Sequence, residues 1–133
     1  MKPIMAVSES GSALMRLYEY VLRATDFLVS ANGTVMSRLF CGINENKKLH
    51  NIFLEKYVVP RRKIQGSIIK EAIASGELKQ DTDPELLIDA LNGPLFFRWL
   101  QGHAPLDKGF AQCIFEKVIP SFKKHAAQGP RMK

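Results

Sequence analysis

The sequence predicts an all-α fold, an antiparallel helical bundle of five to six helices in a single domain. Apolar residues recur at intervals of three and four along most of the 133 residues, which is the spacing of one face of an α-helix. No segment alternates apolar and polar residues for long enough to indicate a β-strand. A chain of this length suits one domain, so we expect residues 1–133 to share one core.

The first expected helix covers residues 12–30, after a polar opening that includes Ser8, Glu9 and Ser10. The dipeptide Asn32-Gly33 is typical of a turn and should end this helix. Six apolar side chains share its inner face: Leu14, Leu17, Tyr18, Val21, Leu22 and Leu28.

Two further helical segments are expected before Gly76. Thr34 can cap a short helix that ends near residue 42, and a longer pattern begins near Asn46. Pro60 interrupts that pattern because its nitrogen cannot donate a backbone hydrogen bond. The sequence leaves open whether Pro60 kinks one helix or separates two.

The segment over residues 84–101 is the most apolar of the expected helices. Asp83 is a suitable N-cap and Pro84 a suitable first residue, while Gly93-Pro94 should bend the helix in its middle. On a helical wheel, Glu85, Asp89 and Asn92 form one face that is expected to be solvated. The same face ends with Phe96 and Trp99, and the other faces are already apolar. Such a helix must be buried on more than one side, either centrally in a monomer or against a partner chain.

The last expected helix starts after Asp107 and carries a wide apolar stripe, with Pro120 bending or fraying its end. The basic tail after residue 122 is expected to be loose. We favour a symmetric dimer that pairs this helix with the preceding one in a four-helix interface. The expected interface residues are Leu91, Leu95, Phe96, Trp99, Phe110, Ile114, Phe115, Val118 and Phe122.

Composition and charge indicate which partners and which cellular location to expect, but they do not identify the function. The net charge is +6, but the basic residues form three separate clusters around residues 47, 62 and 123, which favours solvated helix faces over a nucleic-acid footprint. Cys41 and Cys113 are far apart in apolar surroundings and are expected to be reduced and buried. No apolar run is long enough to cross a membrane and no signal peptide is recognisable, so a cytoplasmic location is expected.

Catalytic and metal-binding patterns are absent from the sequence. His50, His103 and His125 are dispersed, and no phosphate loop, zinc motif or nucleophile elbow occurs. We therefore expect no enzyme activity, no metal site and no cofactor.

A helical domain of this kind can enclose a mostly apolar pocket with a few polar anchors. For each candidate the alternative is ordinary core packing, and Tyr18 and Tyr57 are favoured because a buried hydroxyl needs a partner. Arg98 lies on an apolar column, so it either extends its charged end to solvent, pairs with a carboxylate or meets an acidic ligand, and an intramolecular salt bridge is favoured. The candidate ligand-binding residues are Tyr18, Leu22, Phe40, Phe53, Tyr57 and Ile68.

The stretch PRRKIQGSIIKEAIASGELKQDTDPELLIDALNGPLFFRWLQGHAPLD, residues 60–107, resembles the C-terminal domain of tetracycline-repressor (TetR) family transcriptional regulators. The resemblance depends on Arg61-Arg62 before an apolar helix, the GEL stretch after it, and then the DPE, GPL and PLD stretches in that order. The earlier SESGSALMRLYEYV is similar to the helix that follows the DNA-binding domain in such proteins. The resemblance covers nearly the whole chain.

The resemblance implies a homodimer of helical domains, each holding an unidentified small hydrophobic effector. In such a regulator, expected here to be a repressor, the effector shifts the spacing of two N-terminal helix-turn-helix domains and so releases DNA. No such three-helix unit precedes Ser12, so DNA contact is expected only through an N-terminal domain absent from this sequence. Truncation, proteolysis and natural loss of that domain stay open. The alternatives are a free-standing helical module that binds a hydrophobic molecule or a partner protein, and an enzyme with an unrecognised site.

Overall fold

The computed structural model describes residues 11–123, and these residues are almost entirely helical. The 3₁₀ turns η1 (Ile43–Glu45) and η3 (Ile119–Ser121) and the π-helical segment η2 (Leu54–Val58) supplement the α-helices. Over these residues the only β-type pairing is an isolated bridge between Leu78 and Lys123, so the all-α prediction is confirmed. The α-helices are α1 (Ala13–Val29), α2 (Ala31–Gly42), α3 (Lys47–Phe53), α4 (Val59–Ala74), α5 (Pro84–Gln101) and α6 (Lys108–Val118).

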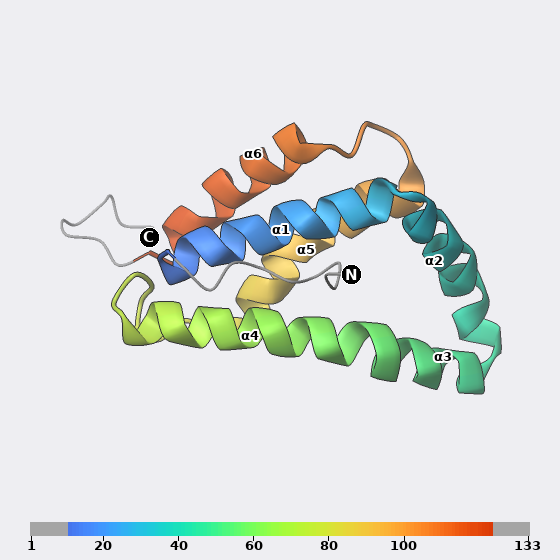
Figure 1. Cartoon of the computed structure of the whole chain (residues 1–133), viewed down its shortest axis with the longest axis horizontal. Coiled ribbons are helices and arrows are strands. Elements are labelled where there is room, and N and C mark those ends of the chain that lie inside the picture. The colour runs from blue at the N-terminus through green and yellow to red at the C-terminus, as the bar shows by residue number, and fades with distance from the viewer. Residues whose placement is uncertain (1–10, 124–133) are drawn as a thin grey trace, which may run out of the picture.

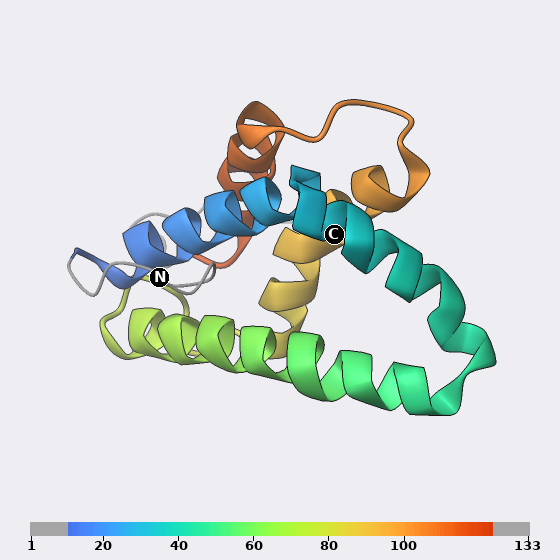
Figure 2. The ribbon, with the colours of Figure 1, turned by 45° about the vertical axis from the view of Figure 1, so that its right-hand side comes forward.

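Helix α1 is the centre of the bundle. It packs against α2, α4, α5 and α6, with α4 on one side of it and α6 on the other (Figure 1). Helix α2 connects the end of α1 to α3, and α3 lies in line with α4 (Figure 1). Helix α5 crosses from α4 towards α1 (Figure 2). The core consists of the inner faces of these helices and includes Leu17, Val21, Ile69, Leu87 and Leu91, all fully buried.

The junction between α1 and α2 differs from the prediction. Ser30 ends α1 and also caps α2, because its hydroxyl oxygen accepts a hydrogen bond from the Gly33 N–H at 3.3 Å. Thr34 is therefore an interior residue of α2 and not its cap, and Asn32-Gly33 forms the first turn of α2. The backbone at this junction is so tightly packed that a Cβ atom on Gly33 would lie 2.0 Å from the carbonyl oxygen of Leu28.

Helices α3 and α4 join through η2 into one uninterrupted rod over residues 47–74. The i→i+5 bonding of η2 comes immediately before Pro60, the second residue of α4. A wider π turn is one way for a helix to pass a residue that cannot donate its own backbone hydrogen bond. Pro60 therefore lies within one rod and does not separate two helices.

Helix α5 continues through Pro94 and ends at Gly102, whose left-handed φ of 64° favours glycine. Both cysteines are exposed, which corrects the prediction that they are buried: Cys41 lies in α2 and Cys113 on the outer side of α6. Within residues 11–123, none of the helices combines the length and apolarity that a bilayer-spanning segment needs. The predicted polar opening at residues 8–10 and the predicted loose tail lie outside the described residues.

Candidate ligand-binding site

A cavity of about 360 Å³ lies between the α3–η2–α4 rod and α5. This volume is near the lower end of the range of about 300–1,000 Å³ that is typical of small-molecule sites. The ten lining residues come from both walls: Phe53, Tyr57, Val58, Arg61, Arg62, Gln65, Asp89, Asn92, Gly93 and Phe96.

Helical spacing explains why these residues meet. On the rod, Phe53, Tyr57, Arg61 and Gln65 are four residues apart, so they form one stripe along it. On α5, the lining residues recur at intervals of three and four from Asp89 to Phe96. Two stripes from two facing helices therefore form the cavity walls.

One end of the cavity is aromatic. The rings of Phe53 and Tyr57 stack with centroids 5.2 Å apart, and Phe96 lies on the opposite wall. Phe40 of α2 packs against a ring of each wall: its ring centroid lies 5.6 Å from that of Phe53 and 6.2 Å from that of Phe96. Trp99 extends this cluster, with its ring centroid 5.0 Å from that of Phe96.

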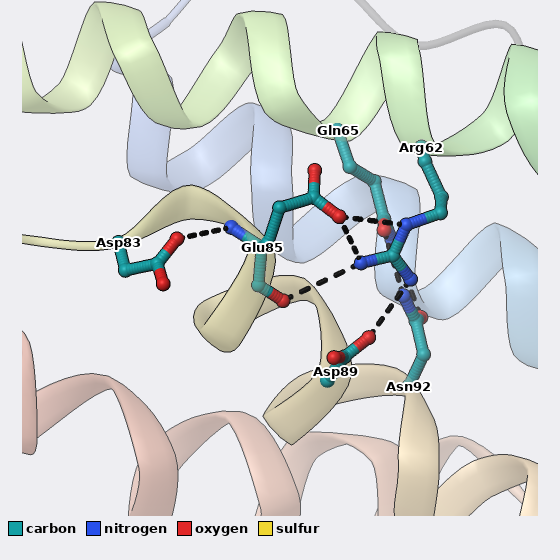
Figure 3. Close-up of polar contacts among 6 residues, drawn as sticks. All are labelled: Arg62, Gln65, Asp83, Glu85, Asp89 and Asn92. Atoms are coloured by element: carbon teal, nitrogen blue, oxygen red, sulfur yellow. Dashed lines mark hydrogen bonds and ion pairs between the residues drawn. The ribbon is translucent and has the colours of Figure 1, made fainter.

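The other end of the cavity is polar (Figure 3). Arg62 Nη1 lies 2.8 Å from Asp89 Oδ1, and Arg62 Nε donates to Glu85 Oε1 at 3.1 Å. The buried amide of Gln65 pairs reciprocally with Asn92: Gln65 Nε2 donates to Asn92 Oδ1 at 3.3 Å, and Asn92 Nδ2 donates to Gln65 Oε1 at 2.7 Å. These contacts tie α4 to α5 at the cavity.

Arg61 lies between two tyrosines. Its guanidinium carbon is 4.7 Å from the Tyr57 ring centroid and 5.7 Å from that of Tyr20, while its backbone oxygen accepts a hydrogen bond from the Tyr20 hydroxyl at 3.4 Å. Burial raises the pKa of the Tyr57 hydroxyl above its ordinary value, and the positive charge of Arg61 only partly opposes this effect. The Tyr57 hydroxyl therefore stays protonated at neutral pH, and it is buried without a hydrogen-bond partner among residues 11–123.

The structure brings together only some of the predicted ligand-binding residues. Phe53 and Tyr57 line the cavity and Phe40 supports its aromatic end. Tyr18, Leu22 and Ile68 do not line it. The Tyr18 ring centroid lies 5.0 Å from that of Phe115 on α6, Ile68 belongs to the core, and Leu22 is partly buried against the core. Whether Phe53 and Tyr57 bind a ligand stays a prediction.

The polar lining residues were not among the predicted binding residues. Arg61 and Arg62 entered the prediction as part of a basic cluster and of the family resemblance, and Asn92 was placed on a solvated face together with Glu85 and Asp89. The sequence did contain one signal for a polar site, because Gln65 is an amide among the apolar positions of its helix. In the structure its side chain is buried, with the residue only 1% exposed.

The predicted interface residues occupy different depths. Leu91 and Leu95 are fully buried within the single chain, so the expectation that they contact a partner is wrong for this structure: their side chains fill its own core. Phe96 and Trp99 are half-buried beside Phe40. The α6 members and Phe122, which follows η3, are also only partly buried: Phe110, Ile114, Phe115, Val118 and Phe122.

The most accessible apolar residues of α5 were not in the predicted interface. Leu86 and Phe97 are each 57% exposed and Leu100 is 47% exposed. Within residues 11–123, Arg98 forms no salt bridge of the predicted kind: it donates to the Pro105 carbonyl at 2.8 Å, and its guanidinium carbon lies 3.6 Å from the Phe110 ring centroid. The described residues contain no group of three or more His, Cys, Asp or Glu side chains that could hold a metal ion.

Comparison with known proteins identifies the family. A sequence profile described as "Tetracyclin repressor-like, C-terminal domain" matches residues 7–118. The chain belongs to this family. This TetR-like domain is 30% identical over 94 residues to the uncharacterized HTH-type transcriptional regulator YdeS of Bacillus subtilis (strain 168). The match covers 71% of this chain but 48% of YdeS, so the chain spans about half the length of that relative.

The fold is also shared with a solved structure. The crystal structure of the TetR family transcription regulator SCO0332 superposes with a TM-score of 0.82, covering 91% of this chain and 67% of the other. The sequence identity is 19%, so this likeness supports the TetR-like fold alone.

Proposed function

We propose that this TetR-like domain is the ligand-sensing and dimerisation domain of a bacterial transcriptional regulator, a repressor, whose DNA-binding competence changes when a small molecule occupies the cavity. The observation that carries the proposal is the cavity between the rod and α5. It combines an aromatic end with a few polar groups, as small-molecule sites do. Operator DNA would be contacted by a helix-turn-helix domain of the full-length protein, and the HTH-type name of the YdeS relative supports this.

The position of the cavity supports a regulatory mechanism. A ligand between the rod and α5 contacts both walls, so it favours whichever separation of the two helices fits it best. In a two-state regulator, such a ligand shifts the population towards that state in proportion to its differential affinity. Helix α5 is a suitable element to transmit this shift, because another of its faces is accessible to a partner.

We propose homodimerisation through this accessible face of α5, hereafter the α5 face, which consists of Leu86, Ala90, Gly93, Phe97 and Leu100. Its three largest side chains are about half exposed or more, and a Cβ atom on Gly93 would have no other atom within 4 Å. Contiguous exposed apolar residues often mark an interface, and a two-fold axis would place two copies of the α5 face against each other. The partly buried α6 residues would complete a four-helix contact.

A ligand screen tests the sensing role. We would record the melting temperature of the purified domain against a library of bacterial metabolites and antibiotics, and repeat each hit with Val58→Trp, which adds bulk to the lining. A ligand at about 100 times its Kd adds about 2.7 kcal/mol to stability, so true hits should raise the Tm by several degrees.

The matched control is Val35→Trp, because Val35 is exposed on α2 away from the lining. Hits should be lost in Val58→Trp and kept in Val35→Trp. Hits that persist unchanged in Val58→Trp would argue against this cavity as the sensor site. A free-standing binding module would give the same hits, but its gene would have no in-frame helix-turn-helix segment.

A further inference from the structure

We infer that the cavity selects an uncharged aromatic amide, a carboxamide or a lactam, whose ring lies against Phe53, Tyr57 and Phe96 and whose amide group bonds the Gln65–Asn92 pair. This inference rests on the proposed ligand-binding function and adds the chemical class of the ligand. Three features of the lining carry it: the aromatic end, the charged side chains that already interact within the domain, and the uncharged amide pair.

The aromatic end favours a flat ring. Phe53 and Tyr57 present stacked rings on one wall, with an interplanar angle of 24°, and Phe96 presents a third ring on the other. Aromatic rings pack favourably in offset-stacked or edge-to-face arrangements with one another. The cavity volume of about 360 Å³ suits a compact ligand with one or two rings.

The aromatic end and the amide pair are close enough for one such ligand to contact both. On α5, Asn92 and Phe96 are four residues apart, which corresponds to about 6 Å along the helix axis. Two fused rings with one substituent span this distance.

The charged side chains of the lining already interact within the domain. Arg62 Nη1 lies 2.8 Å from Asp89 Oδ1, and the carboxylate of Glu85 binds the same arginine. The guanidinium carbon of Arg61 lies 4.7 Å from the ring centroid of Tyr57, and the face of an aromatic ring attracts a cation. A ligand ion would lose hydration on entering and could gain a counter-charge only from a side chain that is already engaged, so an uncharged ligand is favoured.

The Tyr57 hydroxyl shows how this environment acts on an anion. Burial raises the pKa of the hydroxyl, and the positive charge of Arg61 opposes this effect only in part. At this position of the lining, the loss of hydration therefore outweighs the attraction of Arg61 for a negative charge. A carboxylate placed beside Tyr57 would be disfavoured for the same reason.

The amide pair supplies hydrogen bonds without charge. Gln65 of α4 and Asn92 of α5 point towards each other (Figure 3), and each donates one hydrogen bond to the other. Each amide keeps a second N–H and a second oxygen lone pair, so the pair can still donate and accept. Asn92 is the more accessible of the two, because it is half-buried and Gln65 is fully buried. A ligand amide also carries a donor beside an acceptor, so it complements this pair.

Calorimetric titration with four ligands of one ring system tests the inference. The ligands are 2-naphthamide, its methyl ketone isostere 2-acetylnaphthalene, the anion 2-naphthoate and the cation 2-naphthylmethylammonium. We expect 2-naphthamide to bind most tightly, with both ions weaker by at least about tenfold because of their hydration. The ketone lacks the N–H donors, so it should bind about two- to tenfold more weakly than the amide.

The double variant Gln65→Met/Asn92→Leu removes both partners of the amide pair together. Replacing both partners by apolar groups of similar shape avoids leaving one buried amide unsatisfied. We expect the preference for the amide over the ketone to disappear while the ketone keeps its affinity. A pair that served only to join α4 to α5 would change both affinities by the same factor.

Gln112→Met is the matched control, because it removes an exposed amide of α6 that does not line the cavity. It should leave all four affinities unchanged. Circular dichroism and melting curves would show that each variant is folded. If the double variant does not fold, the order of the four affinities in the wild-type domain still decides the ligand class.

Binding of either ion as tightly as 2-naphthamide would overturn the preference for an uncharged ligand. Equal affinity for the amide and the ketone, or an amide preference that survives in the double variant, would overturn recognition by the Gln65–Asn92 pair. No binding of any of the four would also overturn the inference. The sensing role itself would fail only if the library screen gave no hit that depends on Val58, so the two failures are distinguishable.

Discussion

Gly33 shows how one residue determines the path of the chain. It is buried at the start of α2, and a Cβ atom there would lie 2.0 Å from the Leu28 carbonyl oxygen and 2.6 Å from that of Phe27. Both atoms belong to the backbone at the end of α1, so they cannot move aside as a flexible side chain could. The absence of a side chain therefore permits α2 to start directly against α1.

Gly33→Ala should destabilise the domain by about 3 kcal/mol, because relieving this overlap requires the α1–α2 junction to shift. Gly66→Ala is the matched control, since Gly66 lies within α4 and its Cβ would make only an ordinary contact, 4.0 Å from Ile88 Cδ1 of α5. Gly66→Ala should be stabilising by about 0.5–1 kcal/mol through helix propensity. Urea unfolding measures both, and equal effects of the two substitutions would contradict the steric explanation.

Single residues also show where sequence reasoning succeeds and fails. The spacing of apolar residues correctly predicted α1, and Asp83 and Asp107 correctly predicted the starts of α5 and α6. Asn92 was assigned to a solvated face because its neighbours on that stripe are acidic. Only the packing of α4 against α5 reveals that this stripe faces Gln65, and no local pattern records which helix will lie opposite.

At the scale of the helical elements, the start of α1 depends on a side chain far away in sequence. Leu14 N–H donates to Glu77 Oε1 at 3.3 Å, and the Ser75 hydroxyl donates to Glu77 Oε2 at 2.7 Å. Partial burial opposes ionisation, but these hydrogen bonds outweigh it and hold the pKa of the Glu77 carboxyl below its ordinary value. A carboxylate at this end also interacts favourably with the α1 dipole.

Glu77→Gln should therefore lower the stability at pH 7 by about 0.5–1 kcal/mol. Because the pKa is depressed in the folded state, this contribution is present above the ordinary glutamate pKa of 4.5 and is lost as the pH falls through the folded value. The difference between wild type and variant should thus shrink below about pH 4.5 in denaturant titrations. Glu116→Gln, an exposed change on α6, should have an effect within about 0.5 kcal/mol, and a Glu77 effect independent of pH would contradict this assignment.

The π-helical segment η2 marks the limit of prediction at the element scale. Pro60 correctly indicated an irregularity, but the sequence left a kink and a helix boundary open. In the structure the irregularity precedes the proline and leaves the rod continuous. Whether the backbone hydrogen bonds before Pro60 are α-helical or π-helical depends on how the rod packs on the bundle. The spacing of residues in the sequence does not specify that packing.

At the scale of the whole molecule, the apolar character of α5 is divided between two environments. The sequence predicts that this helix needs burial on more than one side, and the structure shows which of its residues are covered by its own chain. Leu91 and Leu95 face the core, whereas the α5 face leaves Leu86, Phe97 and Leu100 accessible. The rotation of α5 about its own axis decides which of its apolar residues face the core and which face outwards. That rotation is set by the packing of all the helices together and cannot be obtained from the sequence of α5 alone.

Phe97→Glu should convert the proposed dimer to a monomer, because it places a charge in the middle of the α5 face. Sedimentation velocity over a range of concentrations measures this, and the expected increase in the dimer Kd is at least about 100-fold. Val35→Glu is the control, since Val35 is similarly exposed but lies on α2. A dimer that survives Phe97→Glu unchanged would remove the α5 face from the interface, and a wild-type domain that stays monomeric at high concentration would remove the dimer itself.

The continuous rod from Lys47 to Ala74 has a mechanical consequence. The 16 residues of α4 extend about 24 Å beyond η2, so a pivot of about 5° at that segment displaces the far end by about 2 Å. That far end leads directly into Ser75 and Glu77, which hold the first turn of α1. A rotation of a few degrees at η2, where Tyr57 lies, would therefore move the far end of α4 by a larger distance, at the point where Glu77 contacts the start of α1.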